Sequence, residues 1–310
     1  MNRMWMAVVL FAAFVLSGCD DMDVFDRAKE DFHYSYALQP GGHLDLNNTN
    51  GSVDIAGWDR DTIDVSGTKF ASTADQLRNV RIKVNVSGKD VSIASEAPNS
   101  SGFLHGSYGV RYMIRVPREI TLGRVETTNG SVSVDDLHGG GRLGSTNGRI
   151  SMARDTGDYE VRTTNGSVEF DGCAGAERAE TTNGSVRGRL SEGAIEARST
   201  NGSIDLTIDK PRNDEPIRAS TVNGGINLTL AAFEGNSVNA ETTHGSITLR
   251  LPPKADARLT AQSTLSTVTS EISLSSTEEM SKHHLTGRLG NGGPLISATT
   301  TTGSIRIARD

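Results

Sequence analysis

VETTNGSVSVDDLHGGGR (residues 125–142) opens a run of five eighteen-residue units, and this run decides the fold. The next four units are LGSTNGRISMARDTGDYE, VRTTNGSVEFDGCAGAER, AETTNGSVRGRLSEGAIE and ARSTNGSIDLTIDKPRND, which ends at residue 214. Each unit carries one Asn-Gly pair, in this order: Asn129 and Gly130, Asn147 and Gly148, Asn165 and Gly166, Asn183 and Gly184, Asn201 and Gly202. A fixed period near twenty residues is the signature of stacked supersecondary units.

The apolar residues of the repeat form columns when the units are aligned. The column before the Asn-Gly pair is Val125, Leu143, Val161, Ala179 and Ala197, and the column after it is Val132, Ile150, Val168, Val186 and Ile204. Polar residues lie between them, and alternation with period two predicts two half-buried strands in each unit. A second glycine column, Gly139, Gly157, Gly175 and Gly193, predicts a second turn. Each unit is therefore predicted to run strand, Asn-Gly turn, strand, glycine turn.

Two all-β architectures fit this pattern. In an antiparallel β-meander the Asn-Gly pairs would be type I′ hairpin turns, which this dipeptide favours. In a parallel β-solenoid they would be corners stacked about 4.8 Å apart, with Asn over Asn and Thr over Thr. We favour the solenoid, because it closes the apolar face on itself and because identical residues at strand spacing can satisfy one another. In that fold the Asn-Gly pairs form a structural turn ladder.

Looser copies of the motif extend the prediction over most of the chain. They are centred on Asn50, Asn223, His244 and Thr302, each followed by glycine. We expect regular solenoid repeats over residues 125–250, irregular N-terminal β rungs over 41–124, and C-terminal rungs with a cap over 251–310.

The N-terminus has the features of an export signal. Arg3 precedes an apolar run that is too short to span a bilayer comfortably, so residues 1–18 are predicted to be a secretory signal peptide. The stretch Leu16-Ser17-Gly18-Cys19 resembles the lipobox of bacterial lipoproteins, which implies acylation of Cys19, for example with palmitate. Several acyl chains would hold the protein firmly on a membrane. Residues 19–40 are predicted to be the lipidated cysteine and an acidic tether, and Asp20 resembles the enteric signal for inner-membrane retention.

Composition narrows the classes of function. The net charge is −7 with no visible basic patch, which argues against nucleic-acid binding. Cys173 is the only thiol besides Cys19, so we expect no internal disulfide and interpret Cys173 as a neutral loop or core residue. Outward columns of the repeat alternate in charge sign, and the adjacent His283 and His284 lack further ligands at coil spacing. We expect no catalytic residue, no metal site and no cofactor.

The sequence also resembles a known family, the bacterial DUF4097 proteins named putative adhesins. The similar stretches are LDLNNTNGSVDIAGWDRDTIDV (44–65), YMIRVP (112–117), the five repeat units, Leu251-Pro252-Pro253 and TTTTGSIRI (299–307). The chain departs from the regular pattern at 65–120 and 254–295, where rungs are expected to be longer or interrupted. The resemblance implies a β-solenoid-like domain, and it offers no catalytic residues to carry over to this chain.

These observations together predict a non-catalytic, membrane-anchored lipoprotein of the bacterial cell envelope, facing the periplasm. It would act as a binding or scaffold module, with an envelope protein or a glycan as partner. Two alternatives stay open, a carbohydrate-processing β-helix enzyme and an accessory protein in envelope-stress signalling. An acidic cleft with clustered carboxylates would favour the enzyme.

Overall fold

Parallel strand pairing builds the middle of the molecule. The computed structural model describes residues 28–96, 108–212 and 215–310. Strands that precede an Asn-Gly corner are β8 (Thr121–Asn129), β10 (Gly141–Asn147), β12 (Tyr159–Asn165) and β16 (Ile217–Asn223). Strands that follow one are β9 (Val132–Asp135), β11 (Ile150–Ala153), β15 (Ile204–Pro211) and β17 (Ile226–Leu230). β13 (Val168–Asn183) and β14 (Val186–Asn201) do both, because each begins after one Asn-Gly corner and ends at the next. β18 (Val238–His244) and β19 (Ile247–Leu251) flank the equivalent corner, His244-Gly245.

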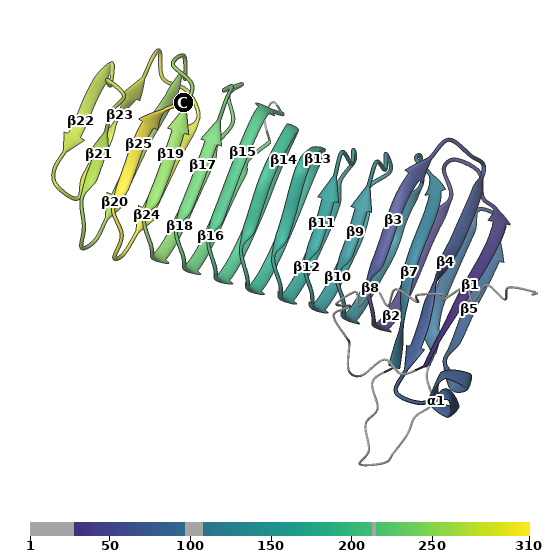
Figure 1. Ribbon diagram of the computed structural model, residues 1–310. Helices are drawn as coiled ribbons and strands as arrows, with labels where there is room; N and C mark the ends of the chain where they lie inside the picture. The colour runs from purple at the N-terminus through teal and green to yellow at the C-terminus, as the bar shows by residue number, and fades with distance from the viewer. Residues whose placement is uncertain (1–27, 97–107, 213–214) are drawn as a thin grey trace, which may run out of the picture.

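The register of these strands confirms the solenoid and excludes the meander. Leu143 pairs with Val125 and with Val161, so residues eighteen apart lie side by side in parallel strands. The same parallel register joins Asn165 to Asn183 and Asn183 to Asn201. We call the strands before the Asn-Gly corner the first face and the strands after it the second face. Figure 1 shows both faces running the length of an elongated stack.

The second corner takes two forms. Gly139 and Gly157 lie in short connections between separate strands, as predicted. At Gly175 and Gly193, β13 and β14 instead pass through the corner as continuous strands, with register shifts between Asp171 and Ala174, so a bulge bends the strand there. The glycines of this corner still stack closely, because an added Cβ at Gly175 would lie 1.8 Å from the carbonyl oxygen of Gly157.

The N-terminal end is built out of chain order. Its elements are β1 (Ala28–Ala37), β2 (His43–Asn50), β3 (Val53–Trp58), β4 (Thr62–Ala71), α1 (Ala74–Asn79), β5 (Arg81–Ser87), β6 (Asp90–Glu96) and β7 (Tyr108–Pro117). β2 and β3 form the rung next to β8 and β9, while β6 and β7 pair parallel on their other side. β4, β1 and β5 then add antiparallel strands at the end. The predicted tether of residues 19–40 is thus partly wrong, because residues 28–37 form a strand.

The C-terminal end repeats this arrangement. Its strands are β20 (Ala257–Ser263), β21 (Val268–Ser270), β22 (Ser276–Met280), β23 (His284–Leu289), β24 (Leu295–Thr300) and β25 (Ile305–Arg309). The last rung in the sequence, β24 and β25, lies between β18–β19 and β20–β21. β23 and β22 follow as antiparallel strands beyond β20. The irregular stretches noted in the sequence are therefore the segments that build these two ends.

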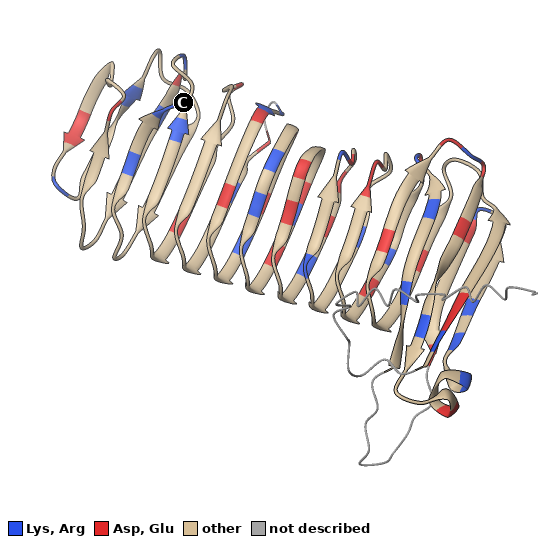
Figure 2. Cartoon of the chain, viewed as in Figure 1, with Lys and Arg blue, Asp and Glu red and all other residues tan. Residues whose placement is uncertain are grey.

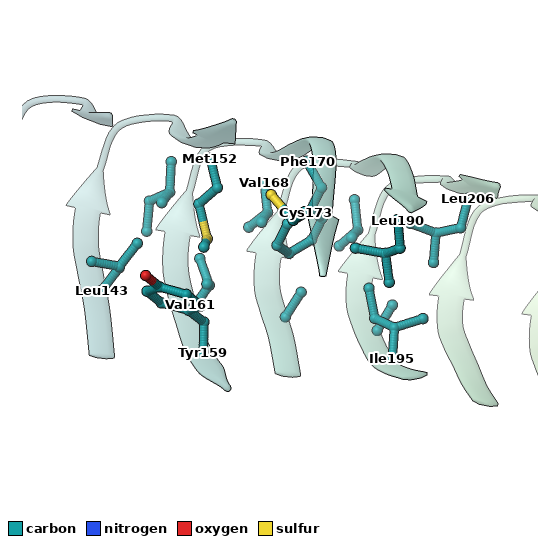
Figure 3. Close-up of a cluster of buried hydrophobic side chains, with 14 of the residues drawn as sticks. Leu143, Met152, Tyr159, Val161, Val168, Phe170, Cys173, Leu190, Ile195 and Leu206 are labelled. Atoms are coloured by element: carbon teal, nitrogen blue, oxygen red, sulfur yellow. The ribbon is translucent and has the colours of Figure 1, made fainter. Parts of the chain in front are cut away.

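The apolar columns fill the space between the two faces. The predicted inward residues Val125, Leu143, Val161, Ala179 and Ala197 are all buried, as are Val132, Ile150, Val168, Val186 and Ile204. Figure 3 shows how side chains from both faces meet in the middle of the stack. Among the described residues the single helix, α1, is six residues long, and no helix is of a length and hydropathy that could cross a membrane.

Candidate binding surface

An asparagine ladder runs along the corner between the two faces. Each asparagine donates from Nδ2 to the Oδ1 of the asparagine in the preceding rung, at 2.7–2.9 Å. The members are Asn50, Asn129, Asn147, Asn165, Asn183, Asn201 and Asn223. The first member, Asn50, donates to the carbonyl oxygen of Tyr108 at 2.8 Å. The ladder predicted from the repeat is therefore present, with every amide oriented in the same direction.

The column continues with other residues toward the C-terminal end. His244 lies in register with Asn223, and its Nδ1 is 3.2 Å from the hydroxyl of Thr302. This placement agrees with the interpretation of His244 as a turn residue. His283 and His284 contact the carbonyl oxygen of Ser266 and the hydroxyl of Thr286. Within residues 28–96, 108–212 and 215–310, no three or more His, Cys, Asp or Glu side chains are arranged to hold a metal ion.

A buried hydroxyl column lies directly inside the asparagine ladder. From Asn129 to His244, the residue two positions before each member of the column is a buried Thr or Ser whose hydroxyl donates to the glycine carbonyl of the preceding rung. Before Asn50 this position is Asn48, whose amide donates to the carbonyls of Gly51 and Val110. The distances are 2.8–3.2 Å for Thr127, Ser145, Thr163, Thr181, Ser199, Thr221 and Thr242. Because a buried carbonyl without a partner is costly, this column explains why the repeat requires Thr or Ser here.

The glycines of the corner are required for space. An added Cβ at Gly166 would lie 2.0 Å from the carbonyl oxygen of Gly148, and Gly130, Gly184 and Gly202 meet the same obstacle. Of the glycines at the corners of the asparagine ladder, Gly51 alone has a φ in the left-handed region, at +119°. Close stacking, and not a positive φ, therefore selects glycine at the corners of the regular rungs.

The exposed neighbours of these residues form a threonine strip, which we define as Thr128, Thr146, Thr164, Thr182 and Thr200. All five are exposed on the first face, immediately beside the asparagine ladder. No hydrogen bond within the described residues uses their hydroxyl groups, in contrast to the buried column. Three of them, Thr164, Thr182 and Thr200, line a groove of about 450 Å³. The strip therefore presents free hydroxyls at each of five consecutive rungs.

Charged side chains border the groove on the side away from the asparagines. Arg162, Glu180 and Arg198 occupy neighbouring rungs, and Glu180 lies 3.4 Å from each of the two arginines. An adjacent column places Arg142, Glu160, Arg178, Glu196 and Arg218 in register with alternating sign. Arg178 lies 2.9 Å from Glu180, so the two columns are joined. Figure 2 shows the mixture of signs on the strands. The predicted alternation is confirmed, and the two columns contain five arginines and three glutamates, so arginine is in excess.

A hollow of about 510 Å³ lies on the second face and contains the outward carboxylates of Asp135, Glu169 and Asp171. Arg154 contacts Asp135 at 2.5 Å, and Arg149 lies 3.4 Å from Glu169. Small side chains in the adjacent rungs leave this part of the face concave. Two of its three carboxylates are therefore ion-paired, which is the cross-rung pairing that the sequence indicated.

The structure describes only one of the two cysteines. Cys19 and the signal peptide lie outside the described residues, so lipidation stays a prediction. Cys173 is a free, fully buried residue of the core. This agrees with the interpretation of Cys173 as a neutral loop or core residue. Burial raises the pKa of its thiol to about 12, so this thiol is protonated and inert as a nucleophile.

These features define a class of protein, the parallel β-solenoid stabilised by stacked polar ladders. More particularly, the chain belongs to the Toastrack DUF4097 family, whose pattern matches residues 42–308. A putative adhesin from Parabacteroides distasonis is similar in structure, with 11% identity, a TM-score of 0.50 and coverage of 90% of this chain and 97% of that one. A putative adhesin from Parabacteroides merdae has 8% identity, a TM-score of 0.47 and coverage of 90% and 97%. A comparison with curated proteins gives no match.

Proposed function

We propose that this protein is a lipid-anchored binding module of the bacterial cell envelope, and that the threonine strip and its groove contact a polyhydroxylated ligand such as a glycan. The observation that carries the proposal is the difference between the two hydroxyl columns. Thr163 and Thr181 bond glycine carbonyls inside the corner, whereas Thr164 and Thr182 have free hydroxyls in solvent. The solved structure from P. distasonis is described as a putative adhesin, and we propose a role of the same class here.

The chemistry of the groove suits a glycan. A hydroxyl both donates and accepts, so a row of threonines can meet sugar hydroxyls in either sense. The strands of neighbouring rungs are about 4.8 Å apart, so the row offers a contact at each step along an extended chain. The neighbouring carboxylate of Glu180 is ion-paired with Arg162, Arg178 and Arg198. Arginines outnumber glutamates beside the groove, which suits a neutral or weakly acidic glycan over a basic ligand.

Anchoring would place this surface at the membrane. Cys19, once acylated, would hold the chain at the periplasmic side of the inner membrane, with Asp20 as the retention signal. We propose no cofactor. An enzyme remains the alternative on account of the carboxylates in the second hollow, and turnover of polysaccharides by the purified protein, lost on changing one of those carboxylates, would establish it.

The direct test is binding of purified envelope glycans to the full chain and to the triple variant Thr164→Val, Thr182→Val and Thr200→Val. Valine keeps the β-branched shape and removes the hydroxyl. Each hydrogen bond contributes about 1 kcal/mol, so affinity should fall about a hundredfold or more.

The matched control is Thr207→Val, Thr229→Val and Thr248→Val, three outward threonines on the second face. This control should bind like the wild type. If both triple variants bind like the wild type, the threonine strip is not the contact surface. If both lose binding, the contact also lies elsewhere.

A further inference from the structure

Four ionisable side chains meet inside the core near the second corner. Asp155, Tyr159, Cys173 and Glu177 are 0%, 2%, 0% and 3% exposed. Tyr159 and Glu177 are paired residues of β12 and β13, while the carbonyl of Asp155 accepts from the amide of Ala174 at 2.8 Å. Figure 3 shows Tyr159 and Cys173 among the apolar side chains of the stack. Polar groups are thus enclosed in a space that the rest of the repeat fills with Val, Ile, Leu and Ala.

Most of the polar atoms in this cluster have no partner. Asp155 Oδ1 accepts from the amide of Leu137 at 2.8 Å. Both carboxyl oxygens of Glu177 make no hydrogen bond with the described residues. The Oδ2 of Asp155 and the hydroxyl of Tyr159 also lack a hydrogen bond of normal geometry, although the backbone of Ala153 lies near the first group and the backbone of Gly140 near the second. Buried polar atoms are nearly always satisfied by protein or by ordered water, so four unpartnered oxygens in adjacent rungs indicate a bound molecule.

The electrostatic surroundings identify how the two carboxyl groups are compensated. The groups that act on Asp155 and Glu177 from the packed elements are Asp135, Asp136, Asp158, Tyr159 and Cys173, and each is acidic. Neither carboxyl is paired with a Lys, Arg or His among the described residues. Burial raises the pKa of Asp155 to about 7 and the pKa of Glu177 well above its usual value. Protons, in place of a counter-ion, therefore neutralise the pair.

We propose that the core holds an internal hydration site here, in which ordered water bridges Asp155, Tyr159 and Glu177 while both carboxyl groups enter the folded core in the neutral form. The three side chains act on one another electrostatically, yet none of their unpartnered oxygens is hydrogen-bonded to another. Water suits such a set of oxygens because one molecule donates twice and accepts twice. A protonated carboxyl supplies the donor that the cluster otherwise lacks.

Protonation in the core links stability to pH. The folded chain keeps protons that the unfolded chain releases above about pH 4, so unfolding becomes easier as the pH rises. For each such group the unfolding constant rises up to about tenfold per pH unit between the unfolded and the folded pKa. For Asp155 the window runs from about 4 to about 7. For Glu177 it also begins near 4 and extends above its usual range.

The experiment measures the unfolding constant of the full chain by denaturant titration between pH 4.5 and 8.5. Glu177→Gln keeps the shape of the side chain and removes its titration. Near pH 6 the unfolding constant of the wild type should therefore rise with each pH unit by about tenfold more than that of the variant. Asp155→Asn provides the second variant and retains an oxygen for the Leu137 amide. The control is Glu241→Gln, an exposed outward carboxylate of β18, which should follow the wild type.

A second measurement keeps the proposal falsifiable if a variant fails to fold. A crystal structure of the wild-type protein should show ordered water against the Glu177 carboxyl and the Tyr159 hydroxyl, and elemental analysis should find no stoichiometric metal. The proposal is overturned by identical pH slopes for the wild type and Glu177→Gln. A retained metal ion, or direct bonding of the side chains without water, would overturn it equally.

Discussion

Replacing Gly166 with alanine tests the stacked corner directly. The new Cβ would lie 2.0 Å from the carbonyl oxygen of Gly148 and 2.5 Å from its carbon, whereas real Cβ contacts essentially never fall below 3.0 Å. Both obstructing atoms are backbone, so rotation of a side chain cannot relieve the clash. The corner must separate from the preceding rung by about 1 Å or more.

The cost follows from the bonds that this separation breaks. Two side-chain bonds join this corner to the preceding rung: the hydroxyl of Thr163 bonds the Gly148 carbonyl at 2.9 Å, and the amide of Asn165 bonds Asn147 at 2.8 Å. Loss of the inner bond leaves the Gly148 carbonyl without its hydroxyl partner, which costs about 1 to 3 kcal/mol, and the exposed bond contributes less. Gly166→Ala should therefore lower the free energy of unfolding by roughly 2 kcal/mol. This loss is a large part of the 5–15 kcal/mol typical of a folded domain.

The assay combines urea denaturation with hydrogen exchange, because long repeat arrays can unfold in parts. Gly225→Ala is the matched control. Gly225 directly follows the corner glycine of another rung, and the nearest atom to an added Cβ there is the Ser246 oxygen at 3.3 Å. Its effect should stay within about 0.5 kcal/mol. Exchange should increase in β10, β11, β12 and the start of β13 for Gly166→Ala, because these strands flank the contact between Gly166 and Gly148. Equal stabilities of the two variants would refute the stacking argument.

Position along the chain does not decide the severity of such a change. Gly303 lies near the C-terminus, and from the sequence alone its substitution would fray only the end of the stack. The structure places its rung between two others, and an added Cβ would lie 1.8 Å from the Gly245 carbonyl oxygen. We therefore expect Gly303→Ala to cost about as much as Gly166→Ala.

The remaining predictions concern the two threonine columns and the anchor. Thr163→Val leaves the buried Gly148 carbonyl without its hydroxyl partner and should cost about 1 to 3 kcal/mol, whereas Thr164→Val should stay within about 0.5 kcal/mol; equal losses in urea denaturation would contradict the distinction. Cys19→Ala should release the protein from membranes or leave its signal peptide uncleaved, because acyl chains supply the anchor; unchanged partitioning into detergent would exclude lipidation.

The regular part of the fold could be predicted because its periodicity is local and repeated. Eighteen-residue spacing fixed the partners of Asn147 and Asn165, and the period-two alternation identified the buried columns correctly. Stacking of identical residues followed, since strand spacing allows each amide to bond the next. The sequence shows that glycine is required at each corner, but it does not show whether space or φ requires it.

The two ends could not be predicted from the same pattern. Any rung with an Asn-Gly or Thr-Gly corner can stack on any other, so the motif at Thr302 does not state which rungs flank it. Its neighbours are set by β20–β23, whose antiparallel pairing depends on contacts remote in sequence. Chain order is a good guide only where the connections are too short to permit an insertion.

The sequence contains an indication of one of the two buried carboxyl groups. Glu177 stands two residues before Ala179, so the parity that buries Ala179 also directs Glu177 into the core. Asp155 gave no such signal, because the bulged second corner interrupts the alternation there. Acidic side chains usually lie on the surface, and those of the charge columns do so. At Glu177 this general rule and the parity of the strand disagree, and parity is correct.

The out-of-order ends also explain how a stack of this kind remains finite. A parallel rung exposes unpaired backbone groups on which another copy could add, and solenoids therefore need ends that discourage pairing. Here β5 and β22 are antiparallel strands at the two ends of the first face, and both carry exposed charged side chains. β22 is also only five residues long and includes Glu278 and Glu279. Short, charged edge strands resist pairing, so the number of rungs, and with it the length of the threonine strip, is set by the chain itself.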